Sequence, residues 1–350
     1  ADSAAATVRF YRYPYTAKKR AINSAIREIY PALFKFVDDH TLITDNILPD
    51  GHFEDWTSSS ALRFYTALSG TLAKTSTAGL TRGGTYSAKY TAGAANDYFY
   101  LSSNSYPRLL DLMGNTITFR CWAYPEVAND AYIAIYTVKA DGTAQTLTST
   151  TTCPAGKWTL LELEDQAIND DIVDIQFRFK IATNTKYAYF DNARTRGVNV
   201  YEYMLPPALQ TGEINQVYIQ STSNADYPCD DLQPDFEHRV FNAEVINDGT
   251  YNYLRLPSNY GSGYQIRLIG TGLLSQMTAY SDTTEINDPE TALLVAYAAY
   301  KLFLNEAGVP SREDKVRFTS RANEWLREYY RLKSSLRMTK PYGTQILRRP

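Results

Sequence analysis

Histidine and cysteine are scarce in this chain of 350 residues, which has three of each. The cysteines are Cys121, Cys153 and Cys229. Their odd number and irregular spacing argue against both a disulfide framework and a zinc site. We interpret them as reduced core thiols in a protein made in the cytoplasm. The histidines stand isolated from one another at His40, His52 and His238.

Catalytic signatures are missing as well. The chain has no H-E-x-x-H, no G-x-S-x-G, no P-loop and no glycine-rich dinucleotide pattern. A glycosidase that works with two carboxyl groups is not excluded by these absences. Acids for it are available in one run: Glu162, Glu164, Asp165, Asp170, Asp171 and Asp174. Such a run is more typical of a solvated loop, and we expect no enzyme.

Long apolar runs are also absent, and none approaches the ~20 residues of a membrane-spanning helix. The first residues, "ADSAAATVRF", lack a charged head followed by an apolar core, so no signal peptide is visible. We therefore expect no membrane partner.

The net charge of -3 conceals basic ends around an acidic middle. Residues 1–35 have seven Lys and Arg against two acids, and residues 315–350 have ten against two. This asymmetry suggests two partners of different chemistry, although the solvated faces of amphipathic helices explain it equally well. Tyrosine is abundant, with 29 residues, and its ring with a polar tip suits recognition surfaces.

Both ends of the chain predict helices. From Ala17 to Tyr30 the apolar residues recur at three- and four-residue spacing, and Pro31 should end this helix. Near the other end, Asp288 caps a helix in "PETALLVAYAAYKLFLNEAG", and Ser311 begins another. The last helix has a packing seam with spacings of four and three: Phe318, Ala322, Trp325, Tyr329, Leu332 and Leu336.

The middle of the chain alternates between apolar and polar residues, as in "TITFRCWAY", "AYIAIYTV" and "DIQFRFKIA". This pattern predicts a two-sheet sandwich over residues 46–197 and a smaller, more irregular β-region over 198–285. Helices in residues 1–45 and 286–337 can share one core if the sandwich is an insertion, which brings its ends close together. The predicted fold class is α+β multidomain, a helical bundle with a small β-domain, interrupted by an inserted jelly-roll sandwich.

The order of these elements resembles the head-to-tail adaptor proteins of tailed bacteriophages. The likeness lies in "AKKRAINSAIREIYPALF", "YEYMLP", "YNYLRLPSNYGSGYQIRLIGTG" and "DPETALLVAYAAYKLF", in this order. It implies a homo-oligomeric ring, of twelve copies in that family, between the portal protein and the tail or neck proteins. Genomic DNA passes through such a ring. The extended tail 338–350 then docks to the portal through Tyr342, Ile346, Leu347, Arg348 and Arg349.

The sandwich segment resembles the jelly-roll carbohydrate-binding modules that are appended to glycoside hydrolases. Its opening "NILPDGHFEDW" and its closing "YAYFDNARTRG" carry the likeness. The resemblance implies a structural Ca²⁺ held by Glu54 and Asp191, with His52 where the family commonly has Asp. The alternative is that both acids merely end their strands. No other cofactor is expected.

An outward face of the sandwich is the candidate contact site. If the three alternating strands quoted above share a sheet, its outer side presents Arg120, Trp122, Tyr124, Tyr132, Tyr136 and Arg178. Trp, Tyr and Arg anchor protein interfaces, and exposed rings can also stack on sugars. We rank protein contact first and surface glycan second, and packing against a neighbouring domain of the ring stays open.

These observations favour a structural virion protein, an adaptor at the head-tail neck that is assembled in the host cytoplasm. A carbohydrate-binding virion protein that adheres to host glycan is the alternative, and a glycoside hydrolase is a distant third.

Overall fold

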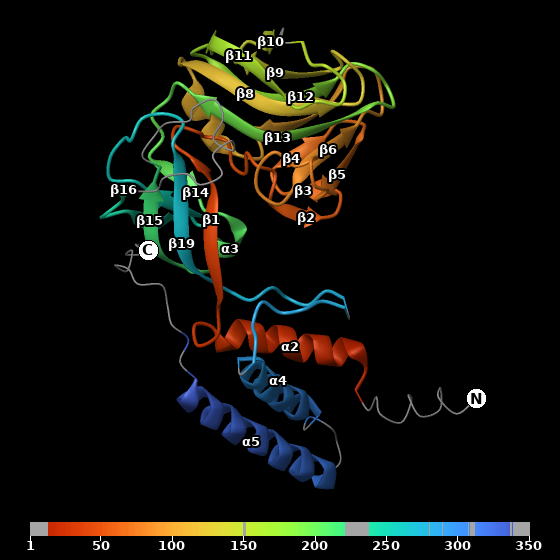
Figure 1. Ribbon diagram of the computed structural model, residues 1–350, viewed down its shortest axis with the longest axis vertical. Coiled ribbons are helices and arrows are strands. Elements are labelled where there is room, and N and C mark those ends of the chain that lie inside the picture. Colours follow the sequence, from red (N-terminus) through yellow and green to blue (C-terminus); the bar gives the residue numbers. More distant parts are fainter. Residues whose placement is uncertain are drawn as a thin grey trace, which may run out of the picture. The chain divides into compact units, whose positions relative to one another are not determined.

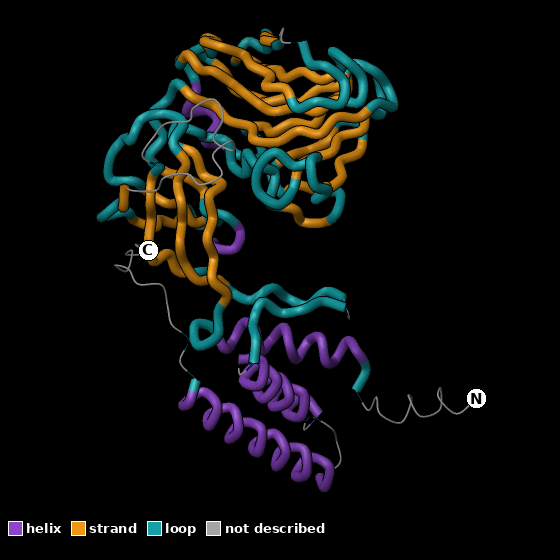
Figure 2. Tube along the Cα trace, in the orientation of Figure 1, coloured by secondary structure: helices purple, strands orange, loops and turns teal. Residues whose placement is uncertain are grey.

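The computed structural model describes residues 13–149, 152–220, 238–279, 281–288, 290–306, 308, 312–336 and 338. Most of its elements are strands (Figures 1 and 2). The chain divides into two compact units, and the division falls within strands β1, β15 and β19. The first unit comprises residues 1–37, 211–214 and 270–343, and the second comprises 38–210, 215–269 and 344–350.

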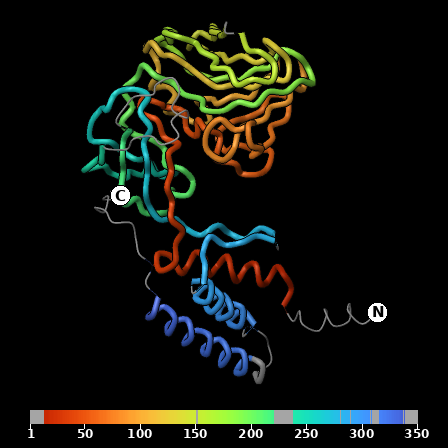
Figure 3. The backbone as a smooth tube through the Cα atoms, viewed as in Figure 1, coloured from red at the N-terminus to blue at the C-terminus, as the bar shows by residue number. Residues whose placement is uncertain are grey.

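The first unit contains helices from both ends of the chain. They are α2 (Tyr15–Ile29), α4 (Glu290–Glu306) and α5 (Arg312–Ser335), seen as red and blue tubes in Figure 3. One hydrophobic cluster joins them, with Ile26 from α2, Leu294 from α4 and Tyr329 from α5. The predicted sharing of a core between the two chain ends is therefore confirmed, and so is the seam on α5. No helix in the described part of the chain has the length and apolar character to cross a membrane.

The second unit contains a sandwich of two five-stranded antiparallel sheets (Figure 1). The first has the order β10-β9-β12-β7-β4, and the second has the order β11-β8-β13-β6-β5. Consecutive strands repeatedly change from one sheet to the other, as in a jelly roll.

The bounds of the strands in the first sheet are β4 Tyr65–Ala67, β7 Asp97–Ser102, β9 Ala131–Lys139, β10 Ala144–Thr148 and β12 Ile172–Ile181. Those in the second are β5 Thr71–Thr75, β6 Ser87–Thr91, β8 Thr116–Pro125, β11 Thr159–Ala167 and β13 Tyr187–Arg196. A two-stranded sheet of β2 (Trp56–Ser58) and β3 (Ala61–Leu62) and the 3-10 helix η1 (Pro107–Leu112) complete the sandwich.

The sandwich core is aromatic. The inward residues of β8 and β12 that the alternation predicts, such as Phe119, Phe177 and Phe179, are fully buried. Phe179 stacks on Phe99 of β7 with ring centroids 4.7 Å apart. The run of acids at 162–174 is not the solvated loop that the sequence suggested, because β11 and β12 take up most of it and alternate inward apolar residues with the acids.

The two ends of the sandwich segment lie side by side. Asn46 Oδ1 accepts a hydrogen bond from the Thr195 backbone N–H at 2.9 Å, and the Ala193 N–H donates to the Gly51 carbonyl at 2.7 Å. Gly51 is required at this approach, since a Cβ there would lie 2.1 Å from the Ala193 oxygen. The closeness of the ends expected for an insertion is confirmed.

A smaller pair of sheets is formed mostly by the chain that follows the sandwich, together with β1, which precedes it. One has the order β1-β19-β15-β16, with β1 Lys35–Ile43, β15 Glu213–Ile219, β16 His238–Arg239 and β19 Gln265–Gly272. The other has the order β14-β18-β17, with β14 Glu202–Met204, β17 Glu244–Asn247 and β18 Asn252–Arg255, and the short helix α3 spans Pro207–Gln210.

The expectation of helix throughout residues 1–45 is wrong for β1. Its sequence KFVDDHTLI has β-branched residues and too few apolar positions for a helical face, so pairing in a sheet prevails. The three-stranded sheet is also more closely tied to the sandwich than the sequence indicated, because Tyr253 of β18 is buried in the sandwich core cluster.

Candidate functional site

The six-residue face predicted from the sequence is divided between two sheets. Arg120, Trp122 and Tyr124 lie on β8, whereas Tyr132 and Tyr136 lie on β9, in the other sheet. Arg178 of β12 pairs beside β9. The condition that these strands share a sheet is therefore not met. Alternation defines which side chains leave the core, but it does not define the sheet to which a strand belongs.

One half of the divided face forms a compact aromatic and cationic surface. We call it the tyrosine face. It consists of the partly buried side chains that alternate outward from β7, β9 and β12: Tyr98, Tyr100, Tyr132, Tyr136, Gln176, Arg178 and Lys180. The strand register places Arg178 opposite Tyr100, and Lys180 opposite both Tyr98 and Tyr132.

Arg178 is held at the middle of the tyrosine face. Its guanidinium lies 3.7 Å from the ring centre of Tyr136 and 4.5 Å from that of Tyr98. Its Nε and Nη2 donate to Gln176 Oε1 at 3.0 and 2.8 Å. Gln176 Nε2 donates in turn to Asp174 Oδ2 at 2.7 Å. The arginine is thus fixed by rings and by an amide before any ligand arrives.

Further hydrogen bonds hold donor and acceptor groups in place at the edge of the tyrosine face. Asp174 Oδ1 accepts hydrogen bonds from the hydroxyls of Ser102 at 3.0 Å and Ser103 at 2.7 Å. Burial, with a smaller contribution from Arg178, lowers the pKa of Lys180. Tyr132 donates its hydroxyl to Asn96 Oδ1 at 3.1 Å. The face therefore offers flat rings beside oriented polar groups, which can contact a ligand that has both apolar and hydroxylated sides.

Tyr98 and Tyr100 were missed in the sequence. They stand two residues apart in "DYFYLS", where Phe99 and Leu101 point into the core. The alternation of outward and inward side chains along this strand was the signal that could have identified them. It was hidden because nearly every residue of this stretch is apolar or aromatic.

The other half of the predicted face is largely covered. Arg120 is 6% exposed and pairs with Glu162 and, at 3.5 Å, with Glu164. Trp122 is 7% exposed, with the Arg82 guanidinium 4.3 Å from its ring centre. The prediction that these two side chains form an exposed contact surface is wrong. The partners that cover them come from β11 and from a loop.

Tyr124 stays partly exposed among other rings. It makes edge-to-face contacts with Trp158 at 5.7 Å and with Tyr189 at 5.9 Å. Lys89 lies 4.1 Å from the ring centre of the neighbouring Tyr187.

The expected calcium ligands, Glu54 and Asp191, are bridged by one loop. Glu54 Oε1 accepts hydrogen bonds from the backbone N–H groups of Thr85 at 2.6 Å and Tyr86 at 2.9 Å. Asp191 Oδ2 accepts from those of Arg82 at 2.7 Å and Gly83 at 3.0 Å. The two carboxyl groups are therefore brought to the same loop.

Both carboxyl groups have raised pKa values, because burial disfavours their ionised forms. Burial raises the pKa of Glu54 to about 7 and, with help from the charge on Glu54, that of Asp191 to about 8. A cation between them would relieve this cost. Across the described residues, however, no three His, Cys, Asp or Glu side chains gather as metal ligands. The chemistry fits Ca²⁺ only if backbone carbonyls supply most of the oxygen ligands.

His52 does not replace the acid that the resemblance placed at its position. It is 4% exposed, and neither ring nitrogen has a hydrogen-bond partner among the described residues. Burial, followed by the charge of Arg194, lowers the pKa of His52 to about 4. Cys121 and Cys153 are buried free thiols, as expected. Cys229 and the predicted portal-binding residues of the tail lie outside the described residues: Tyr342, Ile346, Leu347, Arg348 and Arg349.

No protein-family model and no curated protein matches the sequence. Among solved structures, the C-terminal family 22 carbohydrate-binding module of a Clostridium thermocellum protein is similar, with 18% identity over 45% of this chain and 98% of the module, and a TM-score of 0.37. A xylan-binding domain from Paenibacillus barcinonensis matches with 15% identity over 47% of this chain and 97% of its own, with a TM-score of 0.35. A module in complex with β-1,4-galactotriose matches with 13% identity over 44% and 99%, with a TM-score of 0.30. At these values the assignment of a jelly-roll sandwich rests on the strand order of the chain itself.

Proposed function

We propose that the chain binds glycan through the tyrosine face, without a catalytic step. The observation that carries this proposal is the placement of Arg178, stacked between Tyr136 and Tyr98 and hydrogen-bonded to Gln176. A sugar ring has apolar faces and a rim of hydroxyl groups. Tyrosine rings can cover the former, and oriented guanidinium, amide and carboxylate groups can bind the latter.

Preorganisation supports the proposal. The chain of hydrogen bonds from Ser103 through Asp174 and Gln176 orders long side chains in the free protein. Less side-chain entropy is then lost when a ligand binds. The rings are partly buried, so each is fixed on one side by the sheet and presents the other.

Affinity electrophoresis in gels that contain a soluble polysaccharide tests the proposal. A panel that includes xylan and a β-1,4-galactan is appropriate, because similar structures carry those names. We expect retardation of the full chain by at least one polysaccharide and its loss in Tyr136→Ala. Tyr187→Ala, on the opposite sheet, is the matched control and should keep the retardation. Equal mobility of the full chain in every gel would contradict the proposal.

A second proposal concerns the helical unit, which we propose serves as an adaptor at the neck of a virion. The observation in its favour is that α2, from one end of the chain, and α4 and α5, from the other, share one core. Glu28 of α2 reinforces this core by pairing with Lys301 at 2.5 Å and accepting the Tyr297 hydroxyl at 2.8 Å. The ring, the portal contact through the tail, the tail or neck proteins and the passing DNA all belong to this proposal.

Truncation before Met338 tests the adaptor. The truncated protein should stay soluble and folded, because the buried residues of the helical core precede that residue and only Met338, a partly buried side chain packed against this core, is lost. In particles assembled with it we expect heads without attached tails. Normally tailed particles would refute the role of the C-terminal segment. The two proposals are compatible, since the tyrosine face and the helices belong to different units.

A further inference from the structure

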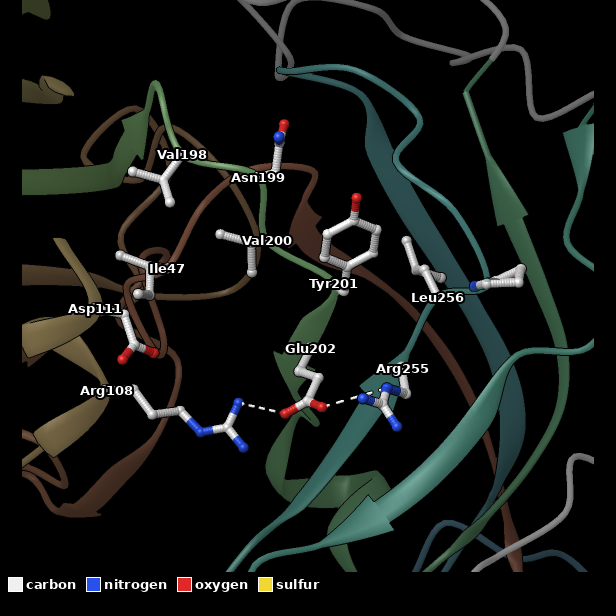
Figure 4. A pocket seen from close by; sticks show the side chains of 11 residues that line it. Ile47, Arg108, Asp111, Val198, Asn199, Val200, Tyr201, Glu202, Arg255 and Leu256 are labelled. Carbon is white, nitrogen blue, oxygen red and sulfur yellow. Dashed lines mark ion pairs between the residues drawn. The ribbon is translucent and has the colours of Figure 1, made fainter. Parts of the chain in front are cut away.

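A pocket lies apart from the tyrosine face, in the same unit, where the segment after the sandwich enters β14 (Figure 4). Its volume is about 400 Å³, which is within the usual range for small-molecule sites. Ile47, Val198 and Val200 contribute apolar side chains on one side, as Figure 4 shows. The ring of Tyr201, which is 43% exposed, also lines the pocket.

Charged groups form the other side of the pocket. Glu202 Oε2 pairs with Arg108 Nη1 at 2.8 Å, and Glu202 Oε1 pairs with Arg255 Nε at 3.4 Å. Two guanidinium groups thus bracket a single carboxylate, and the cluster keeps one positive charge in excess. The remaining acid of the lining, Asp111, is exposed and makes no ion pair in the described part of the chain, so the formal charge of the whole lining is zero.

The two arginines differ in how firmly they are held. The Arg108 guanidinium also lies 3.8 Å from the ring centre of buried Tyr253. Arg255 is more exposed, with 54% of its side chain accessible, and the long contact from Nε is its only ion pair within the described residues. Its two terminal amino groups therefore point to no partner there and form a fork that matches a carboxylate.

We propose that this pocket binds a small organic carboxylate of about the size of one hexuronic acid. The carboxylate of the ligand is matched to Arg255, whose only ion pair in the described part of the chain is the long contact from Nε. The carboxylate lies on the terminal amino groups of Arg255, and the body of the ligand lies against Val198, Val200 and the ring of Tyr201. Glu202 orients both arginines and accepts hydroxyl groups of the ligand.

The proposal does not depend on glycan binding at the tyrosine face, because the two sites share no residue. Titration of the full chain with D-glucuronate, followed by ligand-observed NMR or calorimetry, tests it, with D-glucose as the uncharged comparison. We expect glucuronate to bind, to bind more weakly as salt is added, and to exceed glucose in affinity by about tenfold or more.

Arg255→Ala should weaken glucuronate binding by about tenfold or more, and Arg255→Lys should restore it only in part, because an ammonium lacks the planar fork. Lys157→Ala removes an exposed cation elsewhere and is the control that should leave the affinity unchanged. Tyr136→Ala should also leave it unchanged. No binding at tens of millimolar, equal binding of glucose, or full binding by Arg255→Ala would each overturn the proposal. Loss of binding in Tyr136→Ala would assign the ligand to the tyrosine face instead and would overturn it as well.

Discussion

Protonation of one buried imidazole should make a destabilising contribution to the sandwich as the pH falls. His52 is 4% exposed, and burial together with Arg194 lowers its pKa to about 4. Since neither ring nitrogen has a hydrogen-bond partner among the described residues, protonation in the folded state finds no acceptor to compensate for the buried charge.

The sign and size of the effect follow from linkage. In the unfolded chain a histidine binds its proton near pH 6.5, whereas folded His52 does so only near pH 4. The unfolded state therefore holds more protons between these values, and stability decreases as the pH falls through this window. At about 1.4 kcal/mol per pH unit, the difference amounts to roughly 3 kcal/mol, a large part of the total stability of a typical domain.

Urea denaturation at pH 7, 5.5 and 4 measures the effect, with the full chain compared with His52→Gln. Glu54 and Asp191 titrate in the same range with the opposite sign, so the informative quantity is the difference in pH slope between the two proteins. We expect the variant to lose about 3 kcal/mol less than the full chain on going from pH 7 to pH 4. His238→Gln, at an exposed histidine, is the control. If His52→Gln retains the full slope, the buried neutral imidazole is not the cause.

Four further outcomes are expected. Chelation of Ca²⁺ with EDTA should lower the melting temperature, and Glu54→Gln with Asp191→Asn should abolish the response; an unchanged melting temperature contradicts the metal site. Without metal, the raised pKa values of these two acids imply stability that is lost as the pH rises from about 4 to about 8, and added Ca²⁺ should remove that loss. Phe179→Ala should cost about 3–5 kcal/mol in urea denaturation, because its ring stacks on Phe99 in a fully buried core; a cost below 1 kcal/mol would contradict the packing. A fragment of residues 44–198 should unfold cooperatively but at lower urea than the full chain, because it lacks Tyr253 from the core cluster; equal midpoints would show that the contact contributes nothing.

Local patterns in the sequence predicted which faces of several helices and strands are buried. The spacing of Phe318, Ala322 and Tyr329 identified the buried side of α5, and the alternation around Phe119 and Phe177 identified the inward sides of β8 and β12. Each of these inferences depends on neighbours within one element. That is why they agree with the structure.

What could not be derived depends on contacts between distant segments. The assignment of β8 and β9 to different sheets is a matter of topology, which a period of two does not encode. Trp122 is covered because Asp191 and Glu54 hold a loop whose Arg82 crosses the ring. No local sequence pattern around Trp122 indicates that this ring is buried. The pocket at Arg255 arises in the same way, from side chains that are up to about two hundred positions apart in the chain.

The contacts that join the two ends of the sandwich segment have a consequence for engineering. Asp45 Oδ1 accepts the Val200 backbone N–H at 3.4 Å, immediately outside the point where Asn46 holds Thr195. The chain therefore enters and leaves this domain at adjacent positions. A different domain with adjacent termini can be spliced between these positions and displayed from the same scaffold, if it brings replacements for the contacts that Tyr253 makes.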